Sequence, residues 1–263
     1  MTNKTIVITG ATGGIGTALT NAYSVNNNNL GLIAREHKKL KELSETCSNK
    51  QANITYSGID VRDSKLIKTW INDFDSKNPI DILIANAGVT CGLGENNSQE
   101  LEQEAKRVAD VNYQGTVNTI SSILDKMVER KQGHIVIIAS LAGLSALADM
   151  PSYSASKAAI IAYGHSIRQW LKPYNIHVTI ICPGFITSPM SARHIGKKPF
   201  EMSAENAAVK IVKAINKKKK LYAFPFLLAA GTQACRLLPI FLSDLFMKSY
   251  KADIKKDPRF KIL

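Results

Sequence analysis

Two residues with acid–base chemistry, Tyr153 and Lys157, stand four positions apart in the sequence Y-S-A-S-K. On a helix, residues at this spacing share one face. Free tyrosine titrates near pH ~10 and is a poor acid or base at neutral pH. A lysine one turn away favours the tyrosinate, so the spacing predicts a lowered pKa for Tyr153. The pair could then protonate the oxygen of a carbonyl under reduction, or deprotonate an alcohol under oxidation.

Ser140 is a further candidate, because it directly follows a predicted strand over Ile135–Ala139. The carboxyl ends of parallel strands face the crevice where open α/β sheets bind ligands. The Ser140 hydroxyl could therefore hydrogen-bond a substrate oxygen. The alternative is that Ser140 only caps a turn or helix.

A glycine-rich turn, T-G-A-T-G-G-I-G, occupies residues 9–16 between a predicted strand and a predicted helix. Gly10, Gly14 and Gly16 allow a tight turn in which backbone N–H groups approach a pyrophosphate, and the helix adds its N-terminal dipole. This pattern predicts a dinucleotide site. A glycine turn without any ligand is the alternative.

The end of the second predicted strand indicates which dinucleotide binds. An acidic residue there would hydrogen-bond the ribose 2′-hydroxyl and select NAD. This chain instead has Arg35, and an arginine can pair with a 2′-phosphate and stack on adenine. Lys38 and Lys39 add positive potential, whereas Glu36 does not. We therefore favour NADP(H), with NAD as the alternative cofactor. A further alternative is that Arg35 is only a solvated charge after the strand and contacts no cofactor.

The elements that must position these residues alternate between short apolar runs and segments of helical spacing. Such alternation predicts a parallel sheet covered on both faces and connected by right-handed crossovers. Strands are expected at 5–9, 30–34, 54–56, 80–85, 135–139, 178–182 and 221–224, and helices at 14–26, 37–47, 63–77, 99–130, 152–172 and 203–216. The 99–130 helix could be broken. The predicted fold is a three-layer, doubly wound α/β Rossmann fold with a seven-stranded, mainly parallel sheet.

Over about residues 4–190 the chain resembles the short-chain dehydrogenase/reductase family in its single-domain form. Several motifs carry the resemblance in the family's order: the glycine turn at 9–16, Asp60-Val61, Asn86-Ala87-Gly88, Asn112, Ser140, Tyr153, Lys157, Pro183-Gly184 and Thr187. The resemblance implies hydride transfer between a nicotinamide and a carbonyl or alcohol, a reaction whose chemistry belongs to the cofactor.

The resemblance also implies a role for each motif. Asp60-Val61 would contact adenine, and Asn86-Ala87-Gly88 would support the sheet beside the cofactor. Lys157 would bind the nicotinamide ribose, the main chain of Asn112 would hold a water, and the 183–187 segment would hold the carboxamide. The implied cofactor set is Gly10, Thr12, Gly13, Gly14, Ile15, Gly16, Arg35, Asp60, Val61, Asn86, Ala87, Gly88, Tyr153, Lys157, Pro183, Gly184, Ile186 and Thr187. Relatives usually pair through helices equivalent to 99–130 and 152–172, which implies a homodimer or homotetramer.

The segments expected to line the substrate pocket, 90–94, 141–151 and 185–199, are rich in Leu, Ala and Met. They predict an apolar substrate, such as a long-chain ketone, aldehyde or lipid-like alcohol. The alternative is that these side chains only pack a lid. Candidate substrate contacts are Thr90, Leu141, Met150, Phe185 and Met190.

Charge is unevenly distributed over the 263 residues. The chain carries a net charge of +13, of which +11 falls in residues 193–263 and only +2 in 1–192.

We expect a Rossmann domain over 1–220 and an apolar, basic extension over 221–263 that is part of the same domain or lies on a membrane. Lys217–Lys220 and a possible helical stripe of Ile240, Phe241, Leu245, Phe246 and Tyr250 suggest an anionic membrane surface contacted by 217–250. Packing over the active site or in a dimer interface is the alternative. Nucleic acid is not expected, because no aromatic side chains interleave the lysines.

The remaining features exclude several classes of protein. With 45% hydrophobic and 21% charged residues, the chain is neither disordered nor fibrous. The spacing of its four cysteines suggests neither disulfides nor a metal site, and no uninterrupted apolar run is long enough for a standard membrane span. We expect a cytoplasmic protein, with a peripheral membrane location as the alternative. Two functional alternatives stay open, an NAD-linked alcohol dehydrogenase and an NADPH-binding sensor without turnover.

Overall fold

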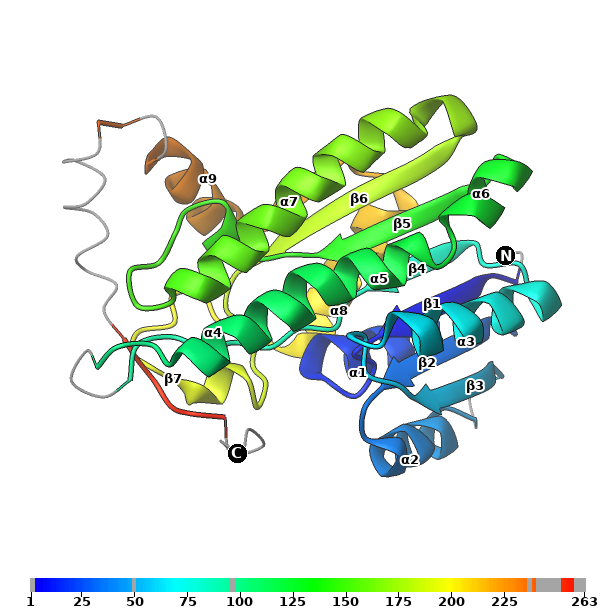
Figure 1. Ribbon diagram of the computed structural model, residues 1–263, viewed down its shortest axis with the longest axis horizontal. Helices are drawn as coiled ribbons and strands as arrows, with labels where there is room; N and C mark the ends of the chain where they lie inside the picture. The colour runs from blue at the N-terminus through cyan, green and yellow to red at the C-terminus, as the bar shows by residue number, and fades with distance from the viewer. Residues whose placement is uncertain (1–2, 49–50, 95–97, 236–237, 240–251, 258–263) are drawn as a thin grey trace.

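The computed structural model describes residues 3–48, 51–94, 98–235, 238–239 and 252–257. Its centre is a sheet of seven parallel strands in the order β3-β2-β1-β4-β5-β6-β8 (Figure 1). The strands are β1 (Thr5–Thr9), β2 (Asn29–Ala34), β3 (Asn53–Gly58), β4 (Ile82–Ala85), β5 (Gly133–Ile138), β6 (Ile176–Pro183) and β8 (Leu221–Phe224). The central strands β1, β4 and β5 are buried along their whole length. Buried, Val- and Ile-rich strands are what a parallel sheet with helices on both faces requires.

Helices cover the two faces of the sheet. They are α1 (Gly14–Tyr23), α2 (His37–Ser48), α3 (Ser64–Lys77), α4 (Glu102–Val108), α5 (Gly115–Ser121), α6 (Leu124–Arg130), α7 (Pro151–Leu171), α8 (Ala204–Asn216) and α9 (Phe226–Cys235). One apolar core joins the sheet to α3, α5 and α7, and a second joins its other face to α1, α2 and α8. The three-layer, doubly wound prediction is therefore confirmed.

Two predicted helices differ from the structure. The helix expected over 14–26 ends at Tyr23, because the Ser24 hydroxyl turns back to the Thr20 carbonyl and Asn26 and Asn27 adopt positive φ. The segment 99–130 is broken, as the sequence allowed. A π-helical stretch over Ala109–Gln114 separates α4 from α5, and Ile123 leaves helical geometry before α6.

The predicted seventh strand, β8, is present and pairs with β6, so residues 221–224 belong to the main sheet. Lys217–Lys220 precede β8 and α9 follows it, which places them at opposite ends of this strand. A separate antiparallel pair joins β7 (His194–Ile195) to β9 (Asp253–Ile254). The stripe expected from Ile240 to Tyr250 lies outside the described residues. Across the described part of the chain, no helix combines the length and apolar character that crossing a bilayer requires.

Candidate active site

A cavity of about 820 Å³ opens at the carboxyl ends of the parallel strands. It is lined by every residue of the predicted cofactor set except Thr187, by Ser140, and by all five candidate substrate contacts. Asn112 and Thr187 do not line it. Thr187 is exposed between two lining residues, Ile186 and Ser188, and its N–H donates to the carbonyl of Met202.

The glycine turn is shaped by contacts that leave no room for side chains. Gly10 has φ +64°, and a Cβ there would lie 2.7 Å from the Cα of Ala87. A Cβ on Gly16 would lie 2.1 Å from the carbonyl oxygen of Gly10. Helix α1 begins after Gly13, which has no side chain to cap it. Backbone N–H groups at this helix start therefore face the cavity without a side-chain competitor, as a bound pyrophosphate requires. On this observation the residues present fit a dinucleotide.

Hydrogen bonds between β1 and β4 hold the turn in place. The hydroxyl of Thr9 accepts from the N–H groups of Asn86 and Ala87 at 3.1 and 3.2 Å. The side-chain amide of Asn86 donates to the carbonyls of Thr9 and Gly10 at 2.9 and 3.1 Å. Asn86 thus positions the turn, and Thr9 is a supporting residue that our sequence analysis did not single out.

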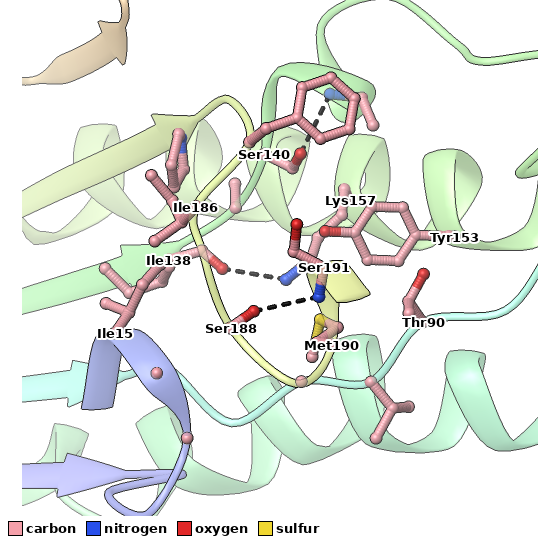
Figure 2. Close-up of a pocket in the computed structure, with 18 of the residues that line it drawn as sticks. Ile15, Thr90, Ile138, Ser140, Tyr153, Lys157, Ile186, Ser188, Met190 and Ser191 are labelled. Atoms are coloured by element: carbon pink, nitrogen blue, oxygen red, sulfur yellow. Dashed lines mark hydrogen bonds between the residues drawn. The ribbon is translucent and has the colours of Figure 1, made fainter. Parts of the chain in front are cut away.

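Tyr153, Lys157 and Ser140 meet inside the cavity (Figure 2). Both Tyr153 and Lys157 project from α7, and the Lys157 Nζ lies 5.7 Å from the centre of the tyrosine ring. Nζ donates to the carbonyl of Ile138 at 3.1 Å, at the end of β5. Ser140 follows two residues later. Its hydroxyl accepts from the N–H of Ala142 at 3.1 Å, so Ser140 does cap a short turn as well as facing the cavity.

Burial controls the pKa values of this pair. Burial raises the pKa of the Tyr153 phenol, and a hydrogen bond with Ser140 offsets only part of the rise. Burial also lowers the pKa of Lys157 to about 8. The prediction that Lys157 lowers the pKa of Tyr153 is therefore wrong in direction. It considered the charge of the lysine and left out the removal of both groups from water.

Asn112 lies fully buried in the π-helical stretch behind the cavity. Its Oδ1 accepts from the N–H of Val89 at 2.8 Å, and its Nδ2 donates to the Val89 carbonyl at 3.0 Å and to the Ser156 hydroxyl at 2.9 Å. Ser156 in turn donates to the carbonyl of Tyr153 at 2.7 Å. Asn112 thus joins the loop after β4 to α7. Ser156 was not among the residues predicted from the sequence, although Ser156 lies inside the Y-S-A-S-K string.

At the far end of the cavity, Arg35, Glu36, Lys39 and Asp60 form a charged rim. Arg35 is exposed, and Lys39 pairs with Glu36 at 2.6 Å. Burial opposes ionisation of Asp60, but hydrogen bonds and charge from Arg62 outweigh it and lower the pKa of that carboxyl. Arg35 contributes to the same lowering, so it lies close enough to act on Asp60.

The opposite end of the cavity is mostly apolar, and part of its wall comes from residues 252–257. Ile254 and Asp257 line the cavity beside Leu147, Met150 and Leu228. Packing of the C-terminal extension over the active site was one of the alternatives expected from the sequence, although no pattern singled out these six residues. Asp257 is buried between the guanidinium groups of Arg107, at 3.3 Å, and Arg193, at 3.5 Å.

Comparison with known proteins agrees with this geometry. The family model for short chain dehydrogenases matches residues 4–198. An uncharacterized oxidoreductase of Myxococcus xanthus is 32% identical over 246 residues, covering 93% of this chain and 96% of the relative. The crystal structure of a 3-oxoacyl-[acyl-carrier protein] reductase with bound NAD from Brucella melitensis superposes with a TM-score of 0.72 at 24% identity, over 84% of this chain and 88% of that one. ElxO with NADP bound gives a TM-score of 0.74 at 22% identity, over 84% and 97%. The chain therefore belongs to the short-chain dehydrogenase/reductase family of NAD(P)-dependent oxidoreductases.

Proposed function

We propose that this protein is an NADP(H)-dependent reductase that interconverts an apolar ketone or aldehyde and its alcohol. One observation carries the proposal. A single cavity joins Tyr153, Lys157 and Ser140 to a rim bearing Arg35 and Lys39 at one end and to an apolar wall at the other.

The nicotinamide, when bound, supplies or accepts the hydride. Tyr153 gives its proton to the oxygen of the carbonyl being reduced, and Ser140 orients that oxygen by a hydrogen bond. Lys157 holds the nicotinamide ribose, and Asn112 fixes the loop and the helix between which these groups lie. The Tyr153 phenol, whose pKa burial raises, is protonated at neutral pH. A protonated phenol suits reduction, because that direction needs a proton donor.

The choice of NADP(H) rests on the charged rim. Arg35 and Lys39 both line the cavity, and an arginine presents a planar donor array that matches a phosphate. Glu36 also lines the cavity and is the observation that favours the second candidate, an NAD-linked dehydrogenase, because a carboxylate can accept from ribose hydroxyls. Glu36 pairs with Lys39, however, so these two charges offset each other and the preference rests on Arg35.

The apolar substrate class rests on the lining of the opposite end. Leu141, Leu147, Met150, Met190 and Leu228 contribute there. Binding an alkyl chain against such a wall is favourable, because it removes the apolar surfaces of both from water. A small polar substrate would leave water in contact with that wall.

We also propose a homodimer or homotetramer, in keeping with the exposure of Tyr113 and Trp170 on the segments expected to pair. Light scattering coupled to gel filtration tests that state.

The decisive experiment is NADPH oxidation against a divided panel, with long-chain ketones and aldehydes in one half and small polar carbonyls in the other. The Tyr153→Phe variant is the control. We expect turnover confined to the apolar half and a loss of at least ~100-fold in the variant, with NADPH binding retained. Equal turnover of both halves would contradict the substrate class. Full activity of Tyr153→Phe would contradict the mechanism, and NADPH binding without any turnover would favour a sensor.

A further inference from the structure

Exposed apolar side chains lie at the wall of the cavity. Phe200 is 54% exposed, Leu227 67% and Leu238 38%, and all three line the cavity. Phe226, beside Leu227, is 78% exposed. We call these four residues the mouth patch. Figure 1 shows α9, which carries Phe226 and Leu227, at the same end of the sheet as β7.

Helix α9 is apolar on its exposed side as well as on its cavity side. None of its ten residues, F-L-L-A-A-G-T-Q-A-C, is charged. Ala229 is buried in the core, whereas Phe226, Leu227 and Ala230 face solvent, and among the described side chains of the helix Gln233 is the one exposed residue with a polar side chain. A surface helix of a soluble protein normally carries charged or polar residues on its outer face. An uncharged outer face with this many apolar side chains suits an apolar environment.

Phe200 adds an independent observation. Its backbone lies at φ +56°, in the left-handed region that bulky residues rarely adopt. Here that conformation accompanies a phenyl ring that is more exposed than buried. Burial of this side chain is only partial, and strained positions of this kind concentrate at functional sites.

Lysines border the same cavity. Lys197 lines it and is exposed. Lys255 and Lys256 are exposed and stand between Ile254 and Asp257, which both line it. Apolar side chains bordered by lysines match a bilayer whose headgroups are anionic, since the apolar groups enter the interface and the cations remain at the phosphates.

We propose that the mouth patch, together with the cavity residue Lys197 and the nearby chain positions Lys255 and Lys256, docks this protein on an anionic membrane, and that its apolar substrate enters the cavity directly from the bilayer. The second half of this statement rests on the proposed apolar substrate, whereas the first half does not. The polybasic run Lys217–Lys220 is not the contact, because it lies at the other end of β8 from α9.

Vesicle co-sedimentation of the full chain tests the docking surface. The vesicles are phosphatidylcholine alone or phosphatidylcholine with roughly one-third phosphatidylglycerol. We expect binding to the anionic vesicles only, weakened when NaCl rises from about 0.1 to about 0.5 M. The double variant Phe226→Ser/Leu227→Ser should bind at least ~10-fold more weakly. Its matched control, Leu66→Ser/Val209→Ser, removes two other exposed apolar side chains, 56% and 66% exposed, from α3 and α8 and should bind as the wild type does.

A charge-reversal pair gives the second arm. Lys255→Glu/Lys256→Glu should reduce binding to anionic vesicles at least ~10-fold, whereas Lys217→Glu/Lys218→Glu should not reduce it to that extent. Binding that is lost only in the 217–218 variant would overturn the proposal. So would absence of vesicle binding by the wild type, or full binding by Phe226→Ser/Leu227→Ser.

Two further readouts keep the outcomes distinct. If Phe226→Ser/Leu227→Ser changes the oligomeric state and the wild type ignores vesicles, the patch is an interface between copies of this chain and the proposal fails. NADPH binding, followed by cofactor fluorescence, shows that each variant is folded, and Leu227→Ser alone replaces the double variant if it is not. Vesicle binding requires no turnover, so failure of the proposed reductase activity leaves this test intact.

Discussion

The ammonium of Lys157 donates to the carbonyl oxygen of Ile138 at 3.1 Å, across 19 residues of sequence. This hydrogen bond ties the start of α7 to the end of β5. Ser140 follows Ile138 by two positions and Tyr153 precedes Lys157 by one helical turn, so the bond holds all three side chains in one frame. The bond also satisfies one donor of an ammonium that is almost completely buried.

Burial of Lys157 should make stability depend on pH. Its pKa in the folded protein is about 8, below its ordinary 10.5, so the folded state releases this proton first. Between these values the unfolded state binds more protons, and the free energy of unfolding contributed by this group rises with pH. Below pH 8 the buried charge only costs stability. We expect Lys157→Met to be inactive yet more stable than the wild type by ~1–3 kcal/mol at pH 7, an advantage that shrinks toward pH 10.

Urea unfolding at several pH values measures this difference. Taking wild type minus Lys157→Met cancels the other groups that titrate in the same range. Lys65→Met, at an exposed lysine of α3, serves as the control and should show no such trend. A constant difference between pH 7 and pH 10 would show that burial does not perturb Lys157.

Arg35 should govern the choice between the two nicotinamide dinucleotides. Arg35→Asp replaces a phosphate-binding cation by a carboxylate that accepts from ribose hydroxyls. We expect the Kd for NADPH to rise at least ~10-fold and the Kd for NADH to change far less. Lys38→Asp changes the charge equally at an exposed position that does not line the cavity, and it should leave the ratio nearly unchanged. Equal weakening of both cofactors by Arg35→Asp would contradict NADP(H) preference.

Asn112 should act as a positioning residue. Asn112→Ala removes its three hydrogen bonds and leaves the N–H and carbonyl of Val89 without these partners inside the protein. The free energy of unfolding should fall by ~2–4 kcal/mol. Because the Val89 loop and α7 lose their tie, kcat should fall while the Kd for NADPH stays within about threefold. A fall in stability with unchanged kcat would assign Asn112 a purely structural role. Asn118→Ala, which removes bonds nearer the surface, is the comparison.

Asp257 should be costly to remove. It is 2% exposed and lies between Arg107 and Arg193, which are 7% and 8% exposed. Asp257→Asn keeps the shape but leaves the two buried cations without its charge, and we expect a loss of ~3–5 kcal/mol. Asp253→Asn, only partly buried four residues earlier, should cost far less. Denaturant unfolding compares the two, and similar losses would show that the ion pairs contribute little.

Local patterns predicted most of the fold and most of the cavity. The strand from Thr5 to Thr9 and the helix start at Gly14 both follow from nearest neighbours in sequence. Parallel order then brings the ends of β1, β4, β5 and β6 to one edge, so that Gly10, Asn86, Ser140 and Pro183 line a single cavity. Period and turn chemistry are sufficient for features of this kind.

Other features depend on contacts that no local pattern encodes. The π-helical stretch around Asn112 interrupts a segment whose periodicity reads as helix. Residues 252–257 have a mostly polar sequence, yet Asp257 is buried between Arg107 and Arg193. Arg107 lies 150 positions earlier in the chain, so no local pattern shows this contact. The pKa of Tyr153 was predicted in the wrong direction because its burial depends on packing around the whole cavity.

The pairing of β7 with β9 brings residues near the C-terminal end of the sequence to the wall of the cavity. Synthesis delivers the glycine turn among the first residues, whereas Ile254 and Asp257 leave the ribosome more than 200 residues later. Domains generally fold as units, so the substrate end of the cavity depends on the last residues to emerge. A nascent chain that ends short of residue 252 therefore has every strand of the main sheet but an incomplete substrate wall. A chain shortened in this way would keep the residues of the glycine turn and lose Ile254 and Asp257, which lie at the substrate end of the cavity.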